Sequence, residues 1–132
     1  IELIIHPSKE NAEVLGNKNK LVQVFVNLIE NSISLSPKKT KILIEAQKMG
    51  MKNIAIKIFD QGAGVDSSES EKIFERFYTD RKENLKNHSG LGLSIAREII
   101  KHMDGSLELV ESEKSEYSGA CFLIILPIRH NP

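Results

Sequence analysis

Aromatic residues are scarce in this chain: they make up 5% of its 132 residues, and tryptophan is absent. A surface that stacks nucleic-acid bases needs aromatic side chains, so their scarcity argues against that class of function. There is one cysteine, which excludes an internal disulfide and fits a reducing compartment. Cys121 stands in an apolar run, where we expect a small buried side chain rather than a nucleophile.

An excess of either charge is also missing, because 18 Lys and Arg residues balance 18 Asp and Glu residues. No overall field therefore indicates nucleic acid or an anionic membrane as a partner. No apolar run approaches the ~18 residues of a membrane span, and no signal peptide opens the chain. The composition is that of a globular protein, 40% hydrophobic and 27% charged, and predicts one domain over residues 1–132. Because the chain begins directly on IELII, we expect it to be part of a longer protein.

The segment LVQVFVNLIENSISLSP, residues 21–37, predicts an amphipathic helix with an unusual polar side. Its expected buried side is Leu21, Phe25, Leu28, Ile29 and Ile33. The opposite side carries Gln23, Asn27, Asn31 and Ser34. Asn27 and Asn31 lie one turn apart, and neutral amide oxygens suit Mg²⁺, a cation that commonly arrives with phosphate. A plain surface face rich in Asn is the alternative that the helix alone leaves open.

Alternating and helical patterns divide the remaining chain into short elements. We expect helices over residues 20–36, 70–77 and 92–104, the first capped by Asn17 or Asn19 and the last ended by Gly105. We expect strands over residues 1–5, 12–15, 41–47, 53–59, 106–110 and 120–126, with a hairpin turn at Met49-Gly50.

Two segments that contain glycine lie between these elements. Asp60-Gln61-Gly62-Ala63-Gly64-Val65 places an acid at the end of a strand, before glycines that let the backbone approach a ligand. Ser89-Gly90-Leu91-Gly92-Leu93 opens a helix, where free amides and the helix dipole favour an anion. Between them, residues 78–88 are polar and rich in lysine, and we expect a mobile lid there. A plain turn and a plain surface loop are the competing interpretations.

Taken together, four segments resemble the catalytic and ATP-binding domain of bacterial sensor histidine kinases, in the Bergerat-fold superfamily of gyrase, Hsp90 and MutL. In order, NLIENS (27–32) is similar to the N box, DQGAGV (60–65) to the first glycine box, IFERFY (73–78) to the F box and SGLGLSIA (89–96) to the second glycine box. Each segment alone is weak evidence, but the ordered set is specific and covers nearly the whole chain.

The resemblance implies a role for each matching residue. Asn31 would coordinate Mg²⁺, Asn27 would support the metal or the phosphates, and Asp60 would accept a hydrogen bond from adenine. Phe74 and Phe77 would anchor the lid. The remaining nucleotide-binding residues would be Gly62, Gly64, Val65, Ser89, Gly90, Leu91, Gly92 and Leu93.

The resemblance also implies a fold and partners. The fold would be a two-layer α/β sandwich, with a mixed, mostly antiparallel five-stranded sheet covered on one face by three helices. ATP and Mg²⁺ would be the cofactors. The partners would be the dimerisation and phosphoacceptor domain of the same protein and, indirectly, a response regulator, with no nucleic acid and no direct membrane contact. The domain would be cytoplasmic, at the inner membrane of a bacterium in the full-length protein.

Several positions depart from the family pattern. A lysine and an aromatic residue usually follow the N box where this chain has Ser34 and Leu35. The missing cation could come from the lid residues Arg81, Lys82 or Lys86. Gln61 and Asn17 replace the commoner Asn and Asp. A degenerate nucleotide-binding module without kinase activity is therefore the alternative function.

The first N-box residue distinguishes branches of the superfamily. Gyrase-like ATPases carry a glutamate general base there, but Asn27 cannot take a proton. This absence fits a phosphoryl donor to an imidazole and disfavours a self-contained ATPase. None of His6, His88, His102 and His130 has the family's acceptor context, so we expect the acceptor on a helical hairpin N-terminal to residue 1.

Overall fold

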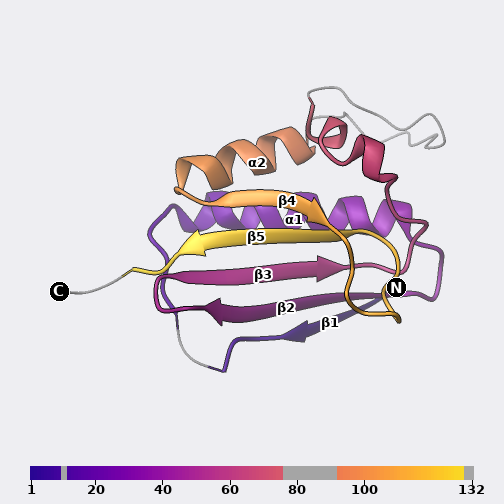
Figure 1. Cartoon of the computed structure of the whole chain (residues 1–132), viewed down its shortest axis with the longest axis horizontal. Coiled ribbons are helices and arrows are strands. Elements are labelled where there is room, and N and C mark those ends of the chain that lie inside the picture. The colour runs from indigo at the N-terminus through magenta and orange to yellow at the C-terminus, as the bar shows by residue number, and fades with distance from the viewer. Residues whose placement is uncertain (10–11, 76–91, 130–132) are drawn as a thin grey trace.

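The computed structural model describes residues 1–9, 12–75 and 92–129, which form a two-layer α/β sandwich (Figure 1). Five strands form one sheet in the order β1-β2-β3-β5-β4. Their bounds are β1 Glu2–His6, β2 Lys41–Met49, β3 Asn53–Phe59, β4 Ser106–Val110 and β5 Cys121–Pro127. β1 pairs parallel with β2, and every other pairing is antiparallel. The predicted fold class is confirmed.

Two α-helices, rather than the three expected, cover one face of the sheet (Figure 1). α1 spans Lys18–Leu35 and α2 spans Gly92–His102. Asn17 caps α1 as predicted, because its side chain accepts from the amides of Asn19 and Lys20. Within the described residues, no helix is long and apolar enough to cross a membrane.

Two of the predicted elements differ in the structure. Of the helix expected over 70–77, the structure describes residues 70–75, and they hold one 3-10 turn, η2 Lys72–Phe74, in place of an α-helix. A second 3-10 turn, η1 Ser67–Glu69, comes just before this range. A single turn suffices to bury Ile73 and Phe74, and the backbone is already extended at Glu75. The strand expected over 12–15 is only one bridge, between Val14 and Ile128.

The buried side of α1 is rotated from the one predicted. Val24 and Leu28 are fully buried, and Asn31 is only 6% exposed. Ile33, expected in the core, is instead 45% exposed. Because α1 packs against both the sheet and α2, its buried side is wider than a single apolar stripe, and it includes the polar Asn31.

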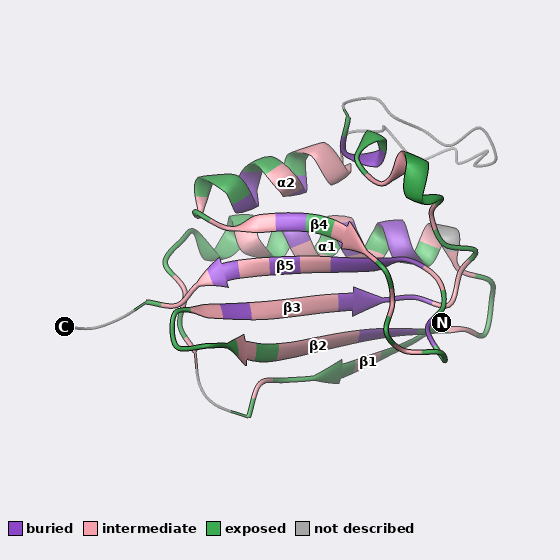
Figure 2. Ribbon diagram, in the orientation of Figure 1, coloured by how far each residue is buried: buried purple, intermediate pink, exposed green. Residues whose placement is uncertain are grey.

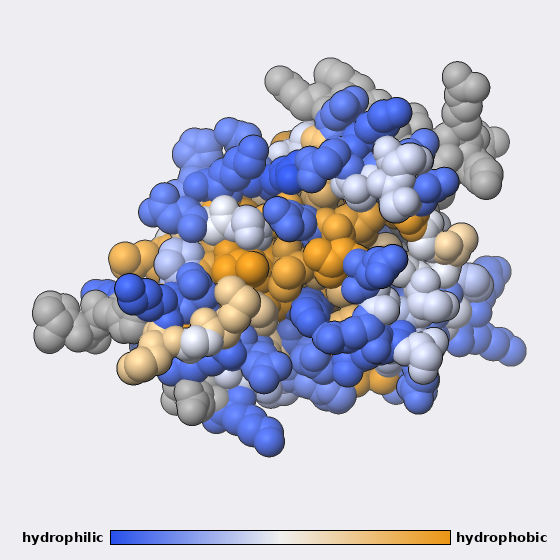
Figure 3. Space-filling view, viewed as in Figure 1, coloured by the Kyte–Doolittle hydropathy of each residue, from blue (hydrophilic) through white to orange (hydrophobic). Residues whose placement is uncertain are grey.

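The sheet buries apolar side chains on both faces. The main core lies between the helices and the sheet, and Figure 2 shows buried stretches on both helices and on β3 and β5. Ile58, Ile100 and Phe122 are among its fully buried members. A smaller cluster of Leu43, Phe59, Tyr117 and Cys121 lies apart from it, where residues 111–120 fold back over the sheet. On the face seen in Figure 3, apolar surface over β4 and β5 shows between polar side chains.

The C-terminal end of α2 corrects the predicted cap. The left-handed residue is Asp104, at φ 60°, and not the glycine after it. Asp104 N donates to Lys101 O, and Gly105 N donates to Ile100 O at 3.0 Å, which is the Schellman arrangement. Gly105 is needed for a different reason, since a Cβ there would overlap Ile125 O and lie 2.8 Å from Leu126 Cδ2.

We predict that Gly105→Ala destabilises the domain by roughly 2–4 kcal/mol, because β5 backbone cannot move away from the added methyl group. Urea unfolding measures the change. Asp104→Gly is the matched control, and it should be neutral or stabilising by up to about 1 kcal/mol, because glycine adopts positive φ without strain. Equal stability of Gly105→Ala and the wild type would contradict the close packing described here.

Candidate functional site

Asp60 follows directly after β3, and its backbone continues the pairing of β3 with β5. Asp60 N donates to Ala120 O at 3.0 Å, and Gly119 N donates to Asp60 O at 3.1 Å. Its side-chain Oδ1 accepts from Gly62 N at 3.0 Å and from Ala120 N at 2.9 Å. The carboxylate is therefore held in one orientation at the end of the sheet.

The other carboxylate oxygen of Asp60 is buried and unpaired. Asp60 is 1% exposed, and Oδ2 has no hydrogen-bond partner among the described residues. Burial raises the pKa of this carboxyl, against the lowering effect of the amides of Gly62 and Ala120 and of the nearby Ser32 hydroxyl. The Ser32 hydroxyl is itself buried and lacks hydrogen-bond geometry to any described atom. Oδ2 is thus an acceptor, withdrawn from water, that a ligand could satisfy.

Gly119 makes room for this arrangement. A Cβ at position 119 would overlap Asp60 Oδ1, and it would lie 2.6 Å from Gly62 N and 2.8 Å from Asp60 O. Any side chain at 119 would therefore displace the carboxylate or the turn that follows it.

The two N-box asparagines have different environments on α1. Asn31 is buried, and its Oδ1 has no hydrogen-bond partner within the described part of the chain. Asn27 is half-buried, and its Nδ2 donates to Gly92 O at 3.1 Å, which joins α1 to the first residue of α2. An unpaired buried amide oxygen is a suitable ligand for a hard cation, so the donor at Asn31 fits Mg²⁺.

The turn after Asp60 is fixed from both sides. Gly64 has φ 80°, close to the backbone of Ser118 and Gly119, and Val65 packs on the main core. Gln61 bridges two segments, since its Oε1 accepts from Lys41 N at 2.8 Å and its Nε2 donates to Glu116 O at 2.9 Å. The longer glutamine, in place of the commoner asparagine, therefore has a structural role.

The F-box residue Phe74 is buried and contacts Arg97 of α2. The Phe74 ring meets the Phe122 ring edge-on, with the two centroids 6.2 Å apart. The guanidinium of Arg97, a residue of α2, lies 4.3 Å from the centroid of the Phe74 ring. Arg97 also pairs with Glu71, with Nη1 and Oε2 2.9 Å apart. These contacts fix the segment that leads into residues 76–91.

Seven predicted site residues and the predicted lid over 78–88 lie outside the described residues. The seven are Phe77, Arg81, Lys82, Lys86, Ser89, Gly90 and Leu91. Of the predicted residues that are described, Asn27 and Gly92 are in contact, as are Asp60 and Gly62. Leu93 packs on the main core.

Sequence reasoning missed two residues of this site, Ser32 and Gly119. The sequence did contain a signal for Ser32, because it lies four residues after Leu28 on the buried side of the helix. Burying a polar side chain there costs free energy unless it is hydrogen-bonded. The sequence contained no such signal for Gly119, because it ends a polar turn and its importance comes from its closeness to Asp60 and Gly62, which lie 59 and 57 residues earlier.

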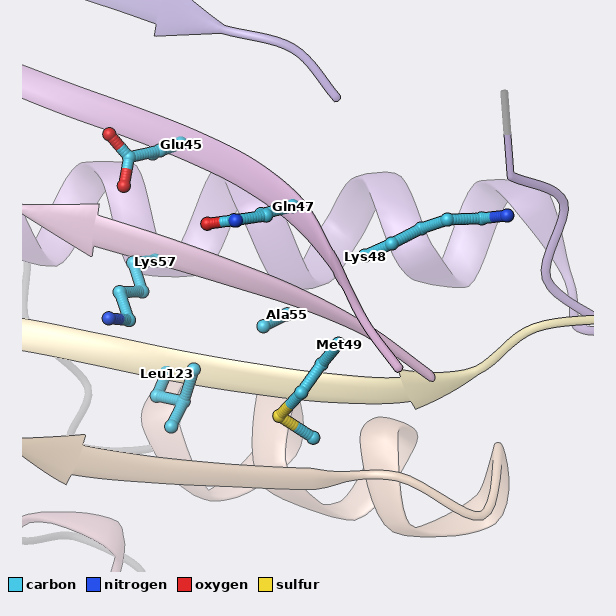
Figure 4. Close-up of a pocket in the computed structure, with 7 residues that line it drawn as sticks. All are labelled: Glu45, Gln47, Lys48, Met49, Ala55, Lys57 and Leu123. Carbon is cyan, nitrogen blue, oxygen red and sulfur yellow. The ribbon is translucent and has the colours of Figure 1, made fainter. Parts of the chain in front are cut away.

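A hollow on the opposite face of the sheet has no part in this site. It measures about 350 Å³, and Figure 4 shows its lining side chains on β2, β3 and β5: Glu45, Gln47, Lys48, Met49, Ala55, Lys57 and Leu123. None of the predicted site residues lines it. Cys121 is also inert, since burial raises the pKa of its thiol to about 11, as expected for a buried small side chain.

The site joins an amide-bearing helix, a buried strand-end acid and the start of a second helix. Residues 16–130 match the model of the family described as histidine kinase-, DNA gyrase B- and HSP90-like ATPase. The chain belongs to this ATPase family. The family predicted from the four ordered segments is thereby confirmed.

The relatives of this ATPase domain include a sensor protein and a sensor-like histidine kinase. The chain is 36% identical over 124 residues to sensor protein ChvG of Rhizobium meliloti, and 32% identical over 119 residues to the sensor-like histidine kinase SenX3 of Mycobacterium tuberculosis. These matches cover 90% and 89% of the chain, but only 21% and 28% of the relatives. The structure of the mycobacterial sensor histidine kinase MprB has the same fold, at TM-score 0.84 and 24% identity, with 97% of this chain and 82% of that one covered.

We predict that Asp60→Asn gains stability relative to the wild type as pH rises. The raised pKa means that folded Asp60 holds its proton more tightly than unfolded Asp60, whose pKa is about 3.9, so protonation favours folding. That contribution is fully present below about pH 3.9 and is lost as pH rises through the raised folded pKa. Asparagine keeps an oxygen for the two amides without the buried charge.

Urea unfolding of both proteins between pH 4 and pH 8 measures this difference. Asp60→Ala is the matched control, and it should be less stable than Asp60→Asn at every pH, because it leaves the amides of Gly62 and Ala120 unpaired. A difference between Asp60→Asn and the wild type that stays constant with pH would show that burial of this charge costs nothing.

We predict that Gly119→Ala weakens binding of a fluorescent ATP analogue at least tenfold, because the added methyl group displaces Asp60. Gly105→Ala is a control that should be destabilised without a change at the site, so it should bind the analogue normally below its melting temperature. Normal binding by Gly119→Ala would mean that the position of the Asp60 carboxylate is irrelevant to the nucleotide.

Proposed function

We propose that this chain is the ATP-binding kinase domain of a sensor histidine kinase, which transfers the γ-phosphoryl group of Mg-ATP to a histidine on a separate dimerisation domain. The observation that carries this proposal is the buried, oriented and unpaired Oδ2 of Asp60 in a chain of this ATPase family. A buried hydrogen-bond acceptor without a partner costs free energy. The amino group of adenine would donate a hydrogen bond to it.

The residues of α1 supply the phosphate end of the proposed site. Asn31 would hold Mg²⁺ through its unpaired Oδ1, and that cation would neutralise charge on the transferring phosphoryl group. Asn27 holds the start of α2 in place through Gly92 O, so the helix that follows the second glycine box is positioned by the N box. The Asn27 amide cannot remove a proton, so the domain would act by positioning its nucleotide and not as a general base.

The acceptor in this proposal lies on another domain. His6 and His102 are exposed, on β1 and α2 respectively, and His102 Nδ1 lies 2.8 Å from Glu98 O within its own helix. His88 and His130 lie outside the described residues. The proposed partners are the dimerisation domain of the full-length protein and, after it, a response regulator. The proposed location is the cytoplasmic side of a bacterial inner membrane.

A nucleotide-binding module without kinase activity is the second candidate. The observation that favours it is at Ser34, where the family usually has a lysine. Ser34 Oγ donates to Asn31 O at 2.8 Å, so this side chain binds its own helix and provides no cation for phosphate. Both candidates bind nucleotide, and only phosphoryl transfer separates them.

The test is labelling of the full-length protein with γ-³²P-labelled Mg-ATP. We expect acid-labile phosphohistidine in the full-length protein and none on residues 1–132 alone. Asn31→Ala should weaken Mg-ATP binding roughly 10- to 100-fold, the loss expected for one ligand to a charged group, with a smaller effect on thermal stability. Gln23→Ala, which removes an exposed amide from the same helix, is the matched control and should bind normally.

Two results would contradict the proposal in different ways. Nucleotide binding without any labelling of the full-length protein would support the second candidate. Equal affinities of Asn31→Ala and Gln23→Ala for Mg-ATP in calorimetric titrations would remove Asn31 from the metal site.

A further inference from the structure

The outer edge of β1 is open in the part of the chain that the structure describes. β1 ends the sheet, and within the described residues no strand pairs with its other side. Leu3 and Ile5 are 46% and 59% exposed. Figure 2 shows β1 mostly in the colour of exposed residues. Edge strands usually carry a charge, a proline or a bulge that prevents pairing with another chain. β4, at the opposite edge, has the exposed Glu108 at its centre, whereas the centre of β1 is Leu3-Ile4-Ile5.

The backbone of β1 shows which groups this edge offers. Glu2 N donates to Thr40 O at 3.0 Å, so Glu2 directs its backbone groups towards β2. In a parallel pair these directions alternate along the strand, so Ile4 and His6 also face β2. The amides and carbonyls of Leu3 and Ile5 therefore point outwards, towards the open edge.

We propose that a second copy of this chain pairs with that edge, β1 against β1 and antiparallel, about a two-fold axis at Ile4. This register places Leu3 opposite Ile5 of the partner subunit, and the two residues whose amides and carbonyls point outwards become a hydrogen-bonded pair. The axis repeats the pair on its other side. Four backbone hydrogen bonds form, and the two sheets become one.

The side chains of β1 are complementary in the same register. Glu2, Ile4 and His6 share the face of the sheet opposite the helices, where Ile4 packs on the smaller apolar cluster. The two-fold axis brings Ile4 beside its own copy and Glu2 beside His6 of the partner subunit. The row across four strands then reads Glu45, His6, the partner's Glu2 and the partner's Lys41, which alternates in charge when the imidazole is protonated.

The size of the interface sets its strength. Five residues a side fall well below the area of a stable dimer, so we expect a weak dimer that forms at roughly 0.1–1 mM protein. β1 lies at the edge of the sheet away from β4 and β5, and neither Asp60 nor Asn31 belongs to it. The association is independent of the proposed function, and the variants at this edge should bind Mg-ATP normally.

Sedimentation equilibrium of residues 1–132 over this concentration range tests the proposal. We expect a monomer–dimer equilibrium in the wild type and at least a tenfold weaker dimer for Leu3→Lys, which puts a charge into the apolar pair. Met49→Lys is the matched control, since Met49 is 45% exposed at the far end of β2, and it should dimerise as the wild type does. A wild type that stays monomeric at 1 mM, or equal dimerisation of Leu3→Lys and Met49→Lys, would overturn the proposal.

Cysteine crosslinking tests the register directly, in a Cys121→Ala background. Across the two-fold axis the Cα atoms at position 4 should be about 4.5 Å apart, within reach of a disulfide, so Ile4→Cys should form a dimer on mild oxidation. Glu2→Cys lies on the same face, but its two copies should be more than 10 Å apart, and it should stay monomeric. Crosslinking of Glu2→Cys as fast as that of Ile4→Cys would exclude this register.

Discussion

The buried carboxylate of Asp60 is the constraint on which the rest of the site depends. One of its oxygens accepts from two backbone amides, and the other is buried without a hydrogen-bond partner among the residues that the structure describes. Those amides, of Gly62 and Ala120, lie 58 residues apart in the sequence, so the carboxylate keeps its orientation only if β3 and β5 pair in the observed register. This orientation of the carboxylate also requires glycine at position 119, because a larger residue would occupy the volume of the carboxylate. An unpaired buried acid lowers the stability of the free protein and prepares it for a ligand that can donate a hydrogen bond there.

The second half of the site is tied to the first through α1. Ser32 lies beside Asp60, and Asn31 precedes Ser32 on the same turn. One turn earlier, Asn27 holds Gly92, so the start of α2 follows the position of α1. Phe74 and Arg97 then link α2 to the segment that enters residues 76–91. A displacement of α1 would therefore change the distance between the acid, the amide oxygen and the second glycine box together.

Local patterns predicted the elements of the fold well where one side of each is polar. The alternation of KILIEAQ and NIAIKIF is that of two half-buried strands, and both are present. Prediction was less accurate where two layers meet. Ile33 was expected in the core but is exposed, and Asn31 is buried, because α1 contacts α2 as well as the sheet. The ordered segments located Asn31 and Asp60, but Gly119 is defined only by its contact with a distant turn. The short F-box segment has the apolar spacing of a helix, yet it needs only one 3-10 turn to bury its two large side chains.

The face of the sheet away from the helices and the outer edge of β1 differ in how far other parts of the chain cover them. On the face away from the helices, residues 111–120 cover one end, with Tyr117 on Phe59 and with Lys114 and Glu113 paired to Glu45 and Lys57. These contacts fix the loop that carries Gly119, so the cover over this face also supports the candidate site around Asp60. Among residues 1–9, 12–75 and 92–129, no strand covers the outer edge of β1, and its parallel pairing with β2 leaves the backbone amides and carbonyls of Leu3 and Ile5 directed outwards. The site end of the sheet is therefore constrained by contacts within the chain, whereas the β1 edge directs backbone amides and carbonyls into solvent, where a further strand could pair with them.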